Sequence, residues 1–347
     1  MSSAERLRDL SSWPLVVAPM AGGPTTVDLV VSAAQAGALG FLAGGYKTAQ
    51  AIGQDIDAVR AATDRAFGIN LFVPGQPTRY PDDLAQYVRT LEGEADAQAT
   101  VVGDPVWDDD DYTEKLEVVL DRRPALVSFT FGCPSRDIVG ALQSEGVLVA
   151  VTVTTPDEAS SARDAGVDCL CLQGSEAGGH RGSFANDDRP RQDYPLETLL
   201  DDVRGRTDIP LIAAGGLHSP DAVAAALAAG ASMVQVGTAF LRCAESGAHP
   251  VYKDALADPR FTATVITRAF SGRRARALRN DFILAHDGAP AAYPEINNAT
   301  RPMRAAAAAK GEPDRMSLYA GEGFAAAEAR PASEIIEQLL AAVRSTA

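Results

Sequence analysis

Short apolar runs recur through the first two thirds of the chain. Each run ends in a glycine-rich or polar tip, and a stretch with helical spacing follows it. The runs are almost continuously apolar, which is typical of strands in a parallel sheet that is covered on both faces. They span residues 15–20, 39–42, 67–73, 125–130, 147–153, 168–173, 209–213 and 233–236. Eight such units predict an α/β protein with a closed (β/α)8 TIM barrel rather than an open sheet.

The stretches between these runs carry the start and stop signals of helices. Thr25 or Thr26 can cap a helix that Gly37 ends, and Ser219-Pro220 can open one that stops at Gly230. Further helices are predicted at residues 48–62, 135–144, 156–165 and 195–203.

The strand-helix alternation is interrupted in two places. Residues 76–122 are acidic and helix-like, and residues 244–347 read as helices and loops without strands. We therefore expect residues 1–75 and 123–243 to form a discontinuous barrel domain. Residues 76–122 and 244–347 would pack together as a smaller, mainly helical lid or substrate domain over the barrel mouth.

Two parts of these segments carry dense charge or a helical pattern. The run Asp108 to Asp111 is expected to be a solvated loop or helix start, because consecutive carboxylates do not converge easily on a metal ion. The arginine-rich stretch 271–280 is expected to form a solvated surface paired with carboxylates. Helices are predicted at residues 263–269 and 332–345.

The tips after the last two predicted strands have the composition of a phosphate site. They contain Gly215, Gly216 and Gly237, followed by Thr238 with its hydroxyl group. In barrels of this kind, backbone amides after strands seven and eight often bind phosphate. FMN is a natural occupant, and a sugar phosphate would serve equally well. No GxGxxG after an early strand and no GxxxxGK[ST] is present, so neither a Rossmann domain nor a P-loop is indicated.

A second glycine-rich tip carries a single imidazole. Residues 174–182 are too rich in glycine for a helix or a central strand, and His180 lies among them. Such a loop could present a base to a bound cofactor, or it could be a tight turn with a solvated histidine. The amides of Asn70 and Gln173, also at strand tips, could contact the polar edge of a flavin or simply satisfy other buried groups.

The composition of the chain limits the classes of partner that we expect it to bind. The chain has 347 residues, a formal charge of -15 and a pI near 4.7, which argues against nucleic acid or an anionic membrane as partner. Four scattered cysteines favour core thiols in a reducing cytosol over disulfides. The N-terminus lacks an apolar signal segment, so a cytoplasmic location is expected. No metal-ligand set is evident, because His218, His249 and His286 are isolated and are expected to be structural or solvated.

A series of motifs closely resembles the nitronate monooxygenase family, formerly called 2-nitropropane dioxygenase. The resemblance covers almost the whole chain in the family's order. The motifs are APMAGGPT (18–25), FGINLFVPG (67–75), VSFTFGCPS (127–135), LQGSEAGGHRG (172–182), PLIAAGGL (210–217), VQVGTAFL (234–241), YPEINNATRPMRAAAA (293–308) and LYAGEGF (318–324).

This resemblance implies an FMN-dependent enzyme that oxidises alkyl nitronates, such as propionate 3-nitronate, with O2 to a carbonyl compound and nitrite. It implies that His180 is the catalytic residue. The imidazole would accept an α-proton from a nitroalkane when neutral, and its protonated form could hold the nitronate anion. The FMN contacts implied by the motifs are Met20, Asn70, Gln173, Gly178, Gly215, Gly216, Gln235, Gly237 and Thr238. The partners would be the nitronate or nitroalkane and O2, and the protein would be a monomer or homodimer.

The chain departs from the family pattern at three positions. Thr130 stands where relatives often carry a histidine, and Tyr319 and Glu322 stand where the family usually has Trp and Gln. Two other functions stay open: an FMN-dependent NADH:quinone or enoyl-thioester reductase on the same fold, and a barrel without flavin that binds a phosphorylated metabolite.

Overall fold

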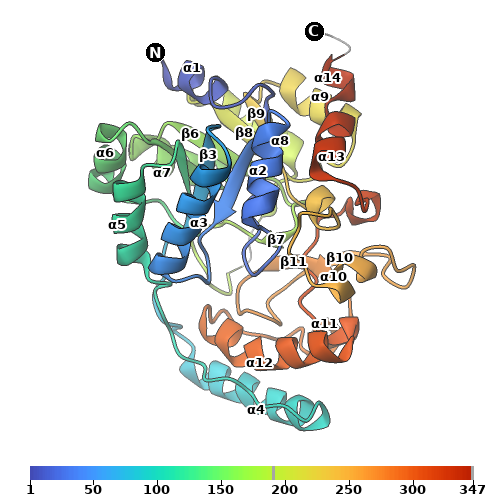
Figure 1. The fold of residues 1–347 in the computed structure, drawn as a ribbon. Helices are drawn as coiled ribbons and strands as arrows, with labels where there is room; N and C mark the ends of the chain where they lie inside the picture. Colours follow the sequence, from blue (N-terminus) through green and yellow to red (C-terminus); the bar gives the residue numbers. More distant parts are fainter. Residues whose placement is uncertain (190–191, 345–347) are drawn as a thin grey trace.

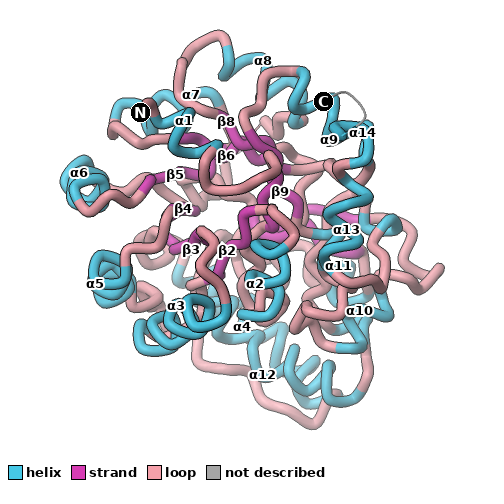
Figure 2. Tube along the Cα trace, turned by 45° about the horizontal axis from the view of Figure 1, so that its top comes forward, coloured by secondary structure: helices cyan, strands magenta, loops and turns pink. Residues whose placement is uncertain are grey.

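The computed structural model describes residues 1–189 and 192–344. Its centre is a closed parallel barrel in which each strand pairs with the next one along the chain and the last pairs with the first (Figures 1 and 2). The barrel strands are β1 (Leu15–Val17), β2 (Leu39–Ala43), β3 (Phe67–Phe72), β4 (Leu126–Thr130), β5 (Leu148–Val153), β6 (Cys169–Gln173), β8 (Leu211–Ala214) and β9 (Met233–Val236). The predicted (β/α)8 TIM barrel is confirmed.

Helices surround the barrel and bury its outer face. They are α2 (Val27–Gln35), α3 (Ala49–Ala62), α5 (Tyr112–Arg122), α6 (Arg136–Ser144), α7 (Pro156–Asp164), α8 (Leu196–Arg204) and α9 (Pro220–Ala228). Most begin at a Ser or Thr whose side-chain oxygen accepts a backbone N–H of the first turn, as Thr26 does for α2 and Ser219 for α9. The predicted helices therefore form at nearly the expected boundaries.

The barrel interior is closed at the end opposite the strand tips. Leu7 of α1 (Ser3–Arg8) packs there with Phe41 and with Cys169 and Cys171 of β6. Both cysteines are buried free thiols, as predicted. Because this end is plugged by apolar side chains, the C-terminal ends of the strands are left to form the open mouth.

The accessory segments pack on one another below the barrel mouth (Figure 1). The inserted helix α4 (Pro81–Ala97) buries Leu84 and Leu91 against Ile296 and Met303 of α12 (Glu295–Lys310). Shorter elements complete this region: α10 (Pro250–Ala255), α11 (Asp281–Ala285), and the 3-10 turns η2 (Pro313–Arg315) and η3 (Phe324–Ala326). The turn η1 (Thr238–Phe240) directly follows β9, and its Phe240 belongs to the barrel core.

Two helices assigned to the accessory domain from the sequence pack on the barrel. Leu116 and Val119 of α5 belong to the barrel core, as do Ile335 and Leu339 of α13 (Ala332–Leu339). The final helix, α14 (Ala341–Arg344), follows directly after α13. We therefore propose to restrict the inserted part of the accessory domain to α4 and its flanking loops, and to group α5, α13 and α14 with the barrel.

The expectation that strands are absent after residue 243 is wrong. An antiparallel sheet joins β10 (Thr264–Thr267), β11 (Ala275–Leu278) and β7 (Gly179–His180), so the predicted helix 263–269 is instead a strand and turn. In this sheet, Ala275 pairs with His180 and Arg276 with Gly179. The glycine-rich loop is thus an edge strand of the accessory sheet rather than a free loop.

The arginine-rich stretch is also more buried than predicted. Arg273 is 4% exposed and stacks its guanidinium 3.9 Å from the centre of the Phe131 ring, while Arg276 is 9% exposed. The expected carboxylate pairing does occur, because Arg274 contacts Asp193 and Arg276 contacts Glu322. A guanidinium can be buried in this way because its flat face stacks on an aromatic ring.

The acidic run is partly buried as well. The Asp110 carboxylate lies 2.7 Å from the ammonium of Lys115, whose side chain is only 1% exposed, and it accepts the backbone N–H of Tyr46. Asp108 accepts a hydrogen bond from Asn298 of α12. The predicted helix start is confirmed, because Asp111 is the N-cap residue of α5, whereas Asp110 is held by Lys115 and by the N–H of Tyr46 rather than by solvent alone.

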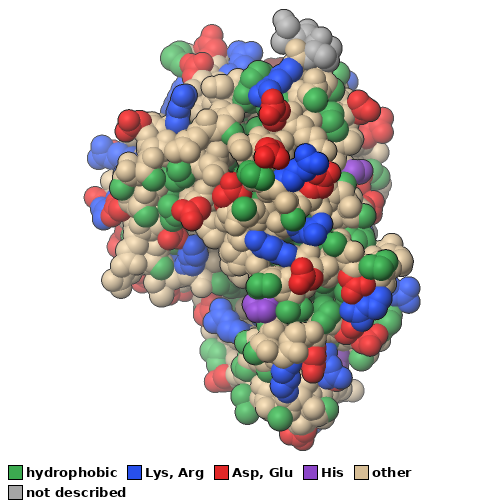
Figure 3. Space-filling view, turned by 45° about the vertical axis from the view of Figure 1, so that its right-hand side comes forward, with side chains coloured by type: hydrophobic (Ala, Val, Ile, Leu, Met, Phe, Trp, Pro, Cys, Tyr) green, Lys and Arg blue, Asp and Glu red, His purple; other side chains and the backbone are tan. Residues whose placement is uncertain are grey.

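On the face drawn in Figure 3, acidic and basic side chains are interspersed. None of the helices within the described residues is long and apolar enough to cross a membrane.

Candidate active site

One cavity of about 600 Å³ opens at the C-terminal ends of the barrel strands, between the barrel and the accessory domain. Every site residue predicted from the sequence lines it. These residues are Met20, Asn70, Gln173, Gly178, His180, Gly215, Gly216, Gln235, Gly237 and Thr238. The structure thus brings together residues that are spread over more than half of the chain, while their roles toward a ligand stay a prediction.

The barrel side of the cavity is built from backbone. Gly215 and Gly216 follow β8 with positive φ angles of 109° and 71°, a conformation that residues with a Cβ rarely adopt. Among the described residues, the backbone N–H groups of Gly216 and Gly237 have no hydrogen-bond acceptor. Unpaired amides at the tips of neighbouring strands suit an anionic group, so this wall fits the phosphate of FMN.

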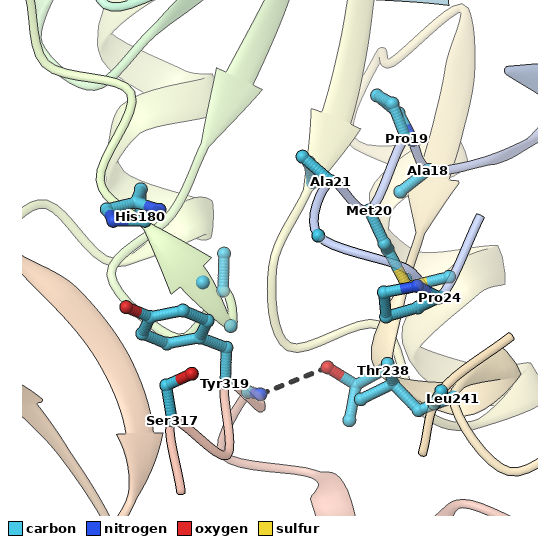
Figure 4. Close-up of a pocket in the computed structure, with 18 of the residues that line it drawn as sticks. Ala18, Pro19, Met20, Ala21, Pro24, His180, Thr238, Leu241, Ser317 and Tyr319 are labelled. Atoms are coloured by element: carbon cyan, nitrogen blue, oxygen red, sulfur yellow. Dashed lines mark hydrogen bonds between the residues drawn. The ribbon is translucent and has the colours of Figure 1, made fainter. Parts of the chain in front are cut away.

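The barrel side of the cavity also contacts the C-terminal tail of the chain. The Thr238 hydroxyl accepts the backbone N–H of Gly321 at 3.0 Å, which leaves its own proton free to donate into the cavity (Figure 4). Gly178 lies so close to the tail that a Cβ on it would be 2.4 Å from the Gly321 nitrogen. The glycine at position 178 is therefore required by the packing of two backbones.

His180 lies on the opposite side of the cavity from Met20 and Thr238 (Figure 4). Its Nε2 atom is 2.8 Å from the Ser271 hydroxyl. Three aromatic rings surround the imidazole, with centroids 5.1 Å away for Tyr319, 5.6 Å for Tyr293 and 5.8 Å for Phe131. The imidazole is thus partly buried among aromatic rings at the cavity wall rather than a freely solvated side chain.

This environment holds the imidazole neutral. Burial, together with the positive charges of Arg273 and Arg304, lowers the pKa of His180 to about 3. The neutral form that a base requires is therefore present throughout the neutral pH range. The predicted anion-holding role of a protonated His180 does not fit this pKa, whereas Arg304, which also lines the cavity, carries a positive charge.

The two amides at strand tips are largely occupied by protein partners. Asn70 donates from Nδ2 to the hydroxyl groups of Ser128 and Thr130, each at 2.9 Å. Gln173 donates to the His180 carbonyl at 3.0 Å and accepts the Gly182 N–H at 2.8 Å. Gln173 therefore fixes the backbone directly after the imidazole-bearing residue, whatever further contact it makes.

The three departures from the family pattern have visible partners. Thr130 bonds Asn70 and Thr152, and Glu322 pairs with Arg276 at 3.0 Å. Tyr319 places its ring beside His180, and its hydroxyl group lies near that of Ser271. Tyr319 thus belongs to the wall that holds the imidazole and Thr130 lines the cavity beside Asn70, whereas Glu322 is not among the lining residues.

Several cavity residues were not predicted from the sequence. Arg301 and Arg304 project from α12, and His218 and His249 also line the cavity although both were expected to be isolated. Glu176 is the one acidic residue among the described lining residues, and its carboxylate accepts the N–H of Leu196. A sequence signal was available only for the arginines: they are spaced i, i+3 and so share one helix face.

Comparison with known proteins agrees with this arrangement. A family model described as nitronate monooxygenase matches residues 4–342. The chain belongs to the nitronate monooxygenase family. The predicted resemblance is confirmed, and the protein is an oxidoreductase of this family.

Relatives of the family are similar over their whole length. The chain is 40% identical to a nitronate monooxygenase of Pseudomonas aeruginosa, covering 95% of this chain and 96% of that protein. It is 33% identical to a probable nitronate monooxygenase of Staphylococcus aureus strain Newman, with 98% and 97% covered.

Solved structures support the same assignment. A nitroalkane oxidase from Streptomyces ansochromogenes superposes with a TM-score of 0.94 at 43% identity, covering 99% of this chain and 100% of that one. FabK from Thermotoga maritima is more distant, with a TM-score of 0.73 at 25% identity over 98% and 96% of the two chains.

Proposed function

We propose that this protein oxidises alkyl nitronates, such as propionate 3-nitronate, with O2 to a carbonyl compound and nitrite, and that it uses FMN as its cofactor. The main observation in support of the proposal is that two walls of different chemistry face each other across one cavity. One wall offers unpaired backbone amides to an anion, and the other holds a neutral, buried imidazole. Membership of the nitronate monooxygenase family supports the substrate class.

The residues fit a flavin mononucleotide in a defined way. Gly215, Gly216, Gly237 and Thr238 would hold the phosphate through backbone amides and one hydroxyl group. Met20, Asn70, Gln173, Gly178 and Gln235 would line the rest of the cofactor. The chemistry that FMN supplies when bound is electron transfer from the nitronate to O2.

His180 would act when the substrate arrives as a neutral nitroalkane. Its imidazole takes the proton from the carbon next to the nitro group, and the electron pair of the C–H bond moves into the nitro group to give the nitronate anion. The positive charges of Arg273 and Arg304, which disfavour the imidazolium in the empty site, favour the anion formed beside it. The aromatic rings around His180 keep water away from this proton transfer.

A rapid-mixing experiment tests the proposal. The purified protein, loaded with FMN, is mixed with propionate 3-nitronate with and without O2, while flavin absorbance, nitrite and carbonyl product are followed. We expect flavin reduction without O2, and nitrite formation with turnover when O2 is present. Rapid reduction by NADH with no reaction toward the nitronate would contradict the proposal and favour a reductase. A protein that stays colourless after FMN addition would favour a barrel for phosphorylated metabolites.

A further inference from the structure

Two arginines of α12 line the cavity without a carboxylate partner. Arg301 and Arg304 are both lining residues, and neither forms an ion pair within residues 1–189 and 192–344. Arg276 of the accessory sheet, by contrast, pairs with Glu322. Arg301 is exposed to solvent, whereas Arg304 is partly buried, so water and salt screen the charge of Arg304 less.

The guanidinium group of Arg304 is held in place by neutral groups. Its Nε donates to the Thr300 hydroxyl at 3.1 Å, and Nη2 donates to the backbone carbonyl and to the side-chain Oδ1 of Asn297, each at 2.9 Å. Among the described residues, Nη1 has a single contact, to the Ser317 hydroxyl at 3.4 Å. Arg304 therefore keeps its full charge in a fixed orientation and has donor capacity left at Nη1.

The charge of Arg304 is not offset by the one acidic residue in the described cavity lining. This residue, Glu176, uses its carboxylate to accept the N–H of Leu196 at the start of α8. A partly buried cation without a counter-ion is unfavourable, and an anionic ligand removes that cost. The cavity therefore favours an anion beside Arg304, although the whole chain has a formal charge of -15.

The phosphate of FMN is not the anion that this arginine suits. The phosphate fits the barrel wall at Thr238, whereas Ser317, which contacts Arg304, lies with Tyr319 on the side of His180 (Figure 4). Arg304 is close enough to contribute to the lowered pKa of His180, yet the two side chains share no hydrogen bond in the described structure. A group bound at Arg304 would thus be a part of the substrate a short way from the carbon that reacts.

We propose that Arg304 is a specificity-determining residue that binds a carboxylate on the substrate. This inference rests on the proposed function and narrows its substrates to nitronates that carry a carboxylate at the far end of a short chain. The planar guanidinium group matches the two oxygens of a carboxylate, and such charge-assisted hydrogen bonds are about twice as strong as neutral ones. In propionate 3-nitronate the two anionic groups lie at opposite ends, so one can contact Arg304 while the other stays beside His180.

A matched pair of substrates tests the assignment. Propyl-1-nitronate is propionate 3-nitronate with a methyl group in place of the carboxylate. We expect Arg304→Gln to lower kcat/KM for propionate 3-nitronate by about 10- to 100-fold, the usual effect of losing a charge-assisted hydrogen bond, and to change kcat/KM for propyl-1-nitronate by less than about threefold. An equal loss on both substrates would place the nitronate group itself at Arg304 and would overturn the proposal.

Arg260→Gln is the control for the lost charge. Arg260 is exposed, does not line the cavity and pairs with Asp258 and Asp314, so this variant should leave the ratio of the two kcat/KM values unchanged. A similar change of this ratio in both variants would mean that net charge sets the preference, which contradicts a bound carboxylate. Should Arg304→Gln not fold, the wild type still tests the proposal, because equal kcat/KM values for the two nitronates would overturn it.

Binding can also be measured without turnover. Succinate keeps the carboxylate of propionate 3-nitronate and places a second planar carboxylate where that substrate has its nitronate group. In isothermal titration calorimetry with FMN present, we expect the affinity for succinate to fall by about tenfold or more in Arg304→Gln and to stay unchanged in Arg260→Gln. Equal affinities of the wild type and Arg304→Gln would overturn the proposal. If the wild type oxidises neither nitronate, the proposed function is wrong, whereas the calorimetry still tests whether Arg304 binds a carboxylate.

Discussion

The two walls of the cavity differ in origin and in chemistry. The barrel wall consists of strand tips rich in glycine, and the residues predicted there to contact a phosphate, Gly215, Gly216, Gly237 and Thr238, carry no titratable side chain. The opposite wall joins an edge strand, a buried turn and the helix α12, and it contains an imidazole, aromatic rings and arginines.

This difference suggests separate tasks for the two walls, anion binding for one and reactivity for the other. Backbone amides bind an anion at any pH, and neighbouring parallel strands place them through local geometry alone. A buried imidazole needs partners for its ring nitrogens and a water-excluding shell, and distant segments must supply both. We therefore expect changes in one wall to affect binding and changes in the other to affect reactivity.

The largest expected effect is that of His180→Gln. We expect the oxidation of a neutral nitroalkane to fall by about 10² to 10⁴, since a positioned base typically contributes this much to the rate. FMN content should be unchanged, because the phosphate wall is separate. Steady-state kinetics and flavin absorbance measure the two effects. His286→Gln, at a site outside the cavity beside Tyr87 and Phe282, serves as the control. A parallel loss of flavin would show that the walls do not act separately.

The next largest effect is expected on stability, for the variant Gly178→Ala, at the contact between the glycine-rich segment and the C-terminal tail. In Gly178→Ala the new Cβ would lie 2.4 Å from the Gly321 nitrogen and 2.5 Å from the Ala320 carbonyl carbon. We expect the free energy of unfolding to fall by about 1–3 kcal/mol because the two backbones must separate. Urea denaturation measures it. Gly140→Ala on α6, where nothing lies within 4 Å of the new Cβ, should be neutral or slightly stabilising. Equal stability of the two variants would contradict the close packing.

The lowered pKa of His180 predicts a pH dependence of stability. The unfolded chain binds a proton on this imidazole below about pH 6.5, whereas the folded protein binds it only near pH 3. Between these values the unfolded state holds more protons, so stability is lost as the pH falls. From pH 7 to pH 4.5, the wild type should lose about 2 kcal/mol more than His180→Gln. Urea titrations of both proteins without flavin test this, and parallel curves would mean that the imidazole is solvated.

The smallest effect is expected for Thr238→Val. The Gly321 N–H loses its acceptor, which should lower the free energy of unfolding by about 1 kcal/mol. FMN affinity should fall by less than about tenfold, because the neighbouring backbone amides remain. Fluorescence titration with FMN and urea denaturation measure the two quantities. Thr63→Val, which removes an exposed acceptor of the Arg65 N–H, is the control. An unchanged FMN affinity would remove Thr238 from the phosphate site.

Strand boundaries could be predicted because they depend on local patterns. The run at residues 67–73 became β3, and the run at 233–236 became β9 with the same boundaries. In a parallel barrel both faces of a strand are buried, so its sequence is apolar throughout and is bounded by glycine or polar residues. The same rule predicted that the glycine residues after each strand lie at the end of the barrel where the cavity opens.

The tail was predicted poorly for two reasons. Residues 264–267 are Thr-Val-Ile-Thr, four β-branched residues that favour a strand, so the helix predicted at 263–269 missed a local signal for β10, which pairs with β11. The arginines at 273 and 276 were expected in solvent, but Phe131, Ser175 and Glu322 give their guanidinium groups buried partners. The residues next to these arginines in the sequence do not predict those partners.

The sequence by itself determined the barrel, the glycine residues at its strand tips and the presence of His180 in the glycine-rich segment. Those features follow from apolar periodicity and from the steric freedom of glycine, both of which act between near neighbours. Only the tertiary structure decided the state of that imidazole: its burial, the two arginines that keep it neutral and the serine behind it. These depend on contacts between residues about ninety or more positions apart, such as His180 with Ser271, because only the folded chain brings such groups within hydrogen-bond distance.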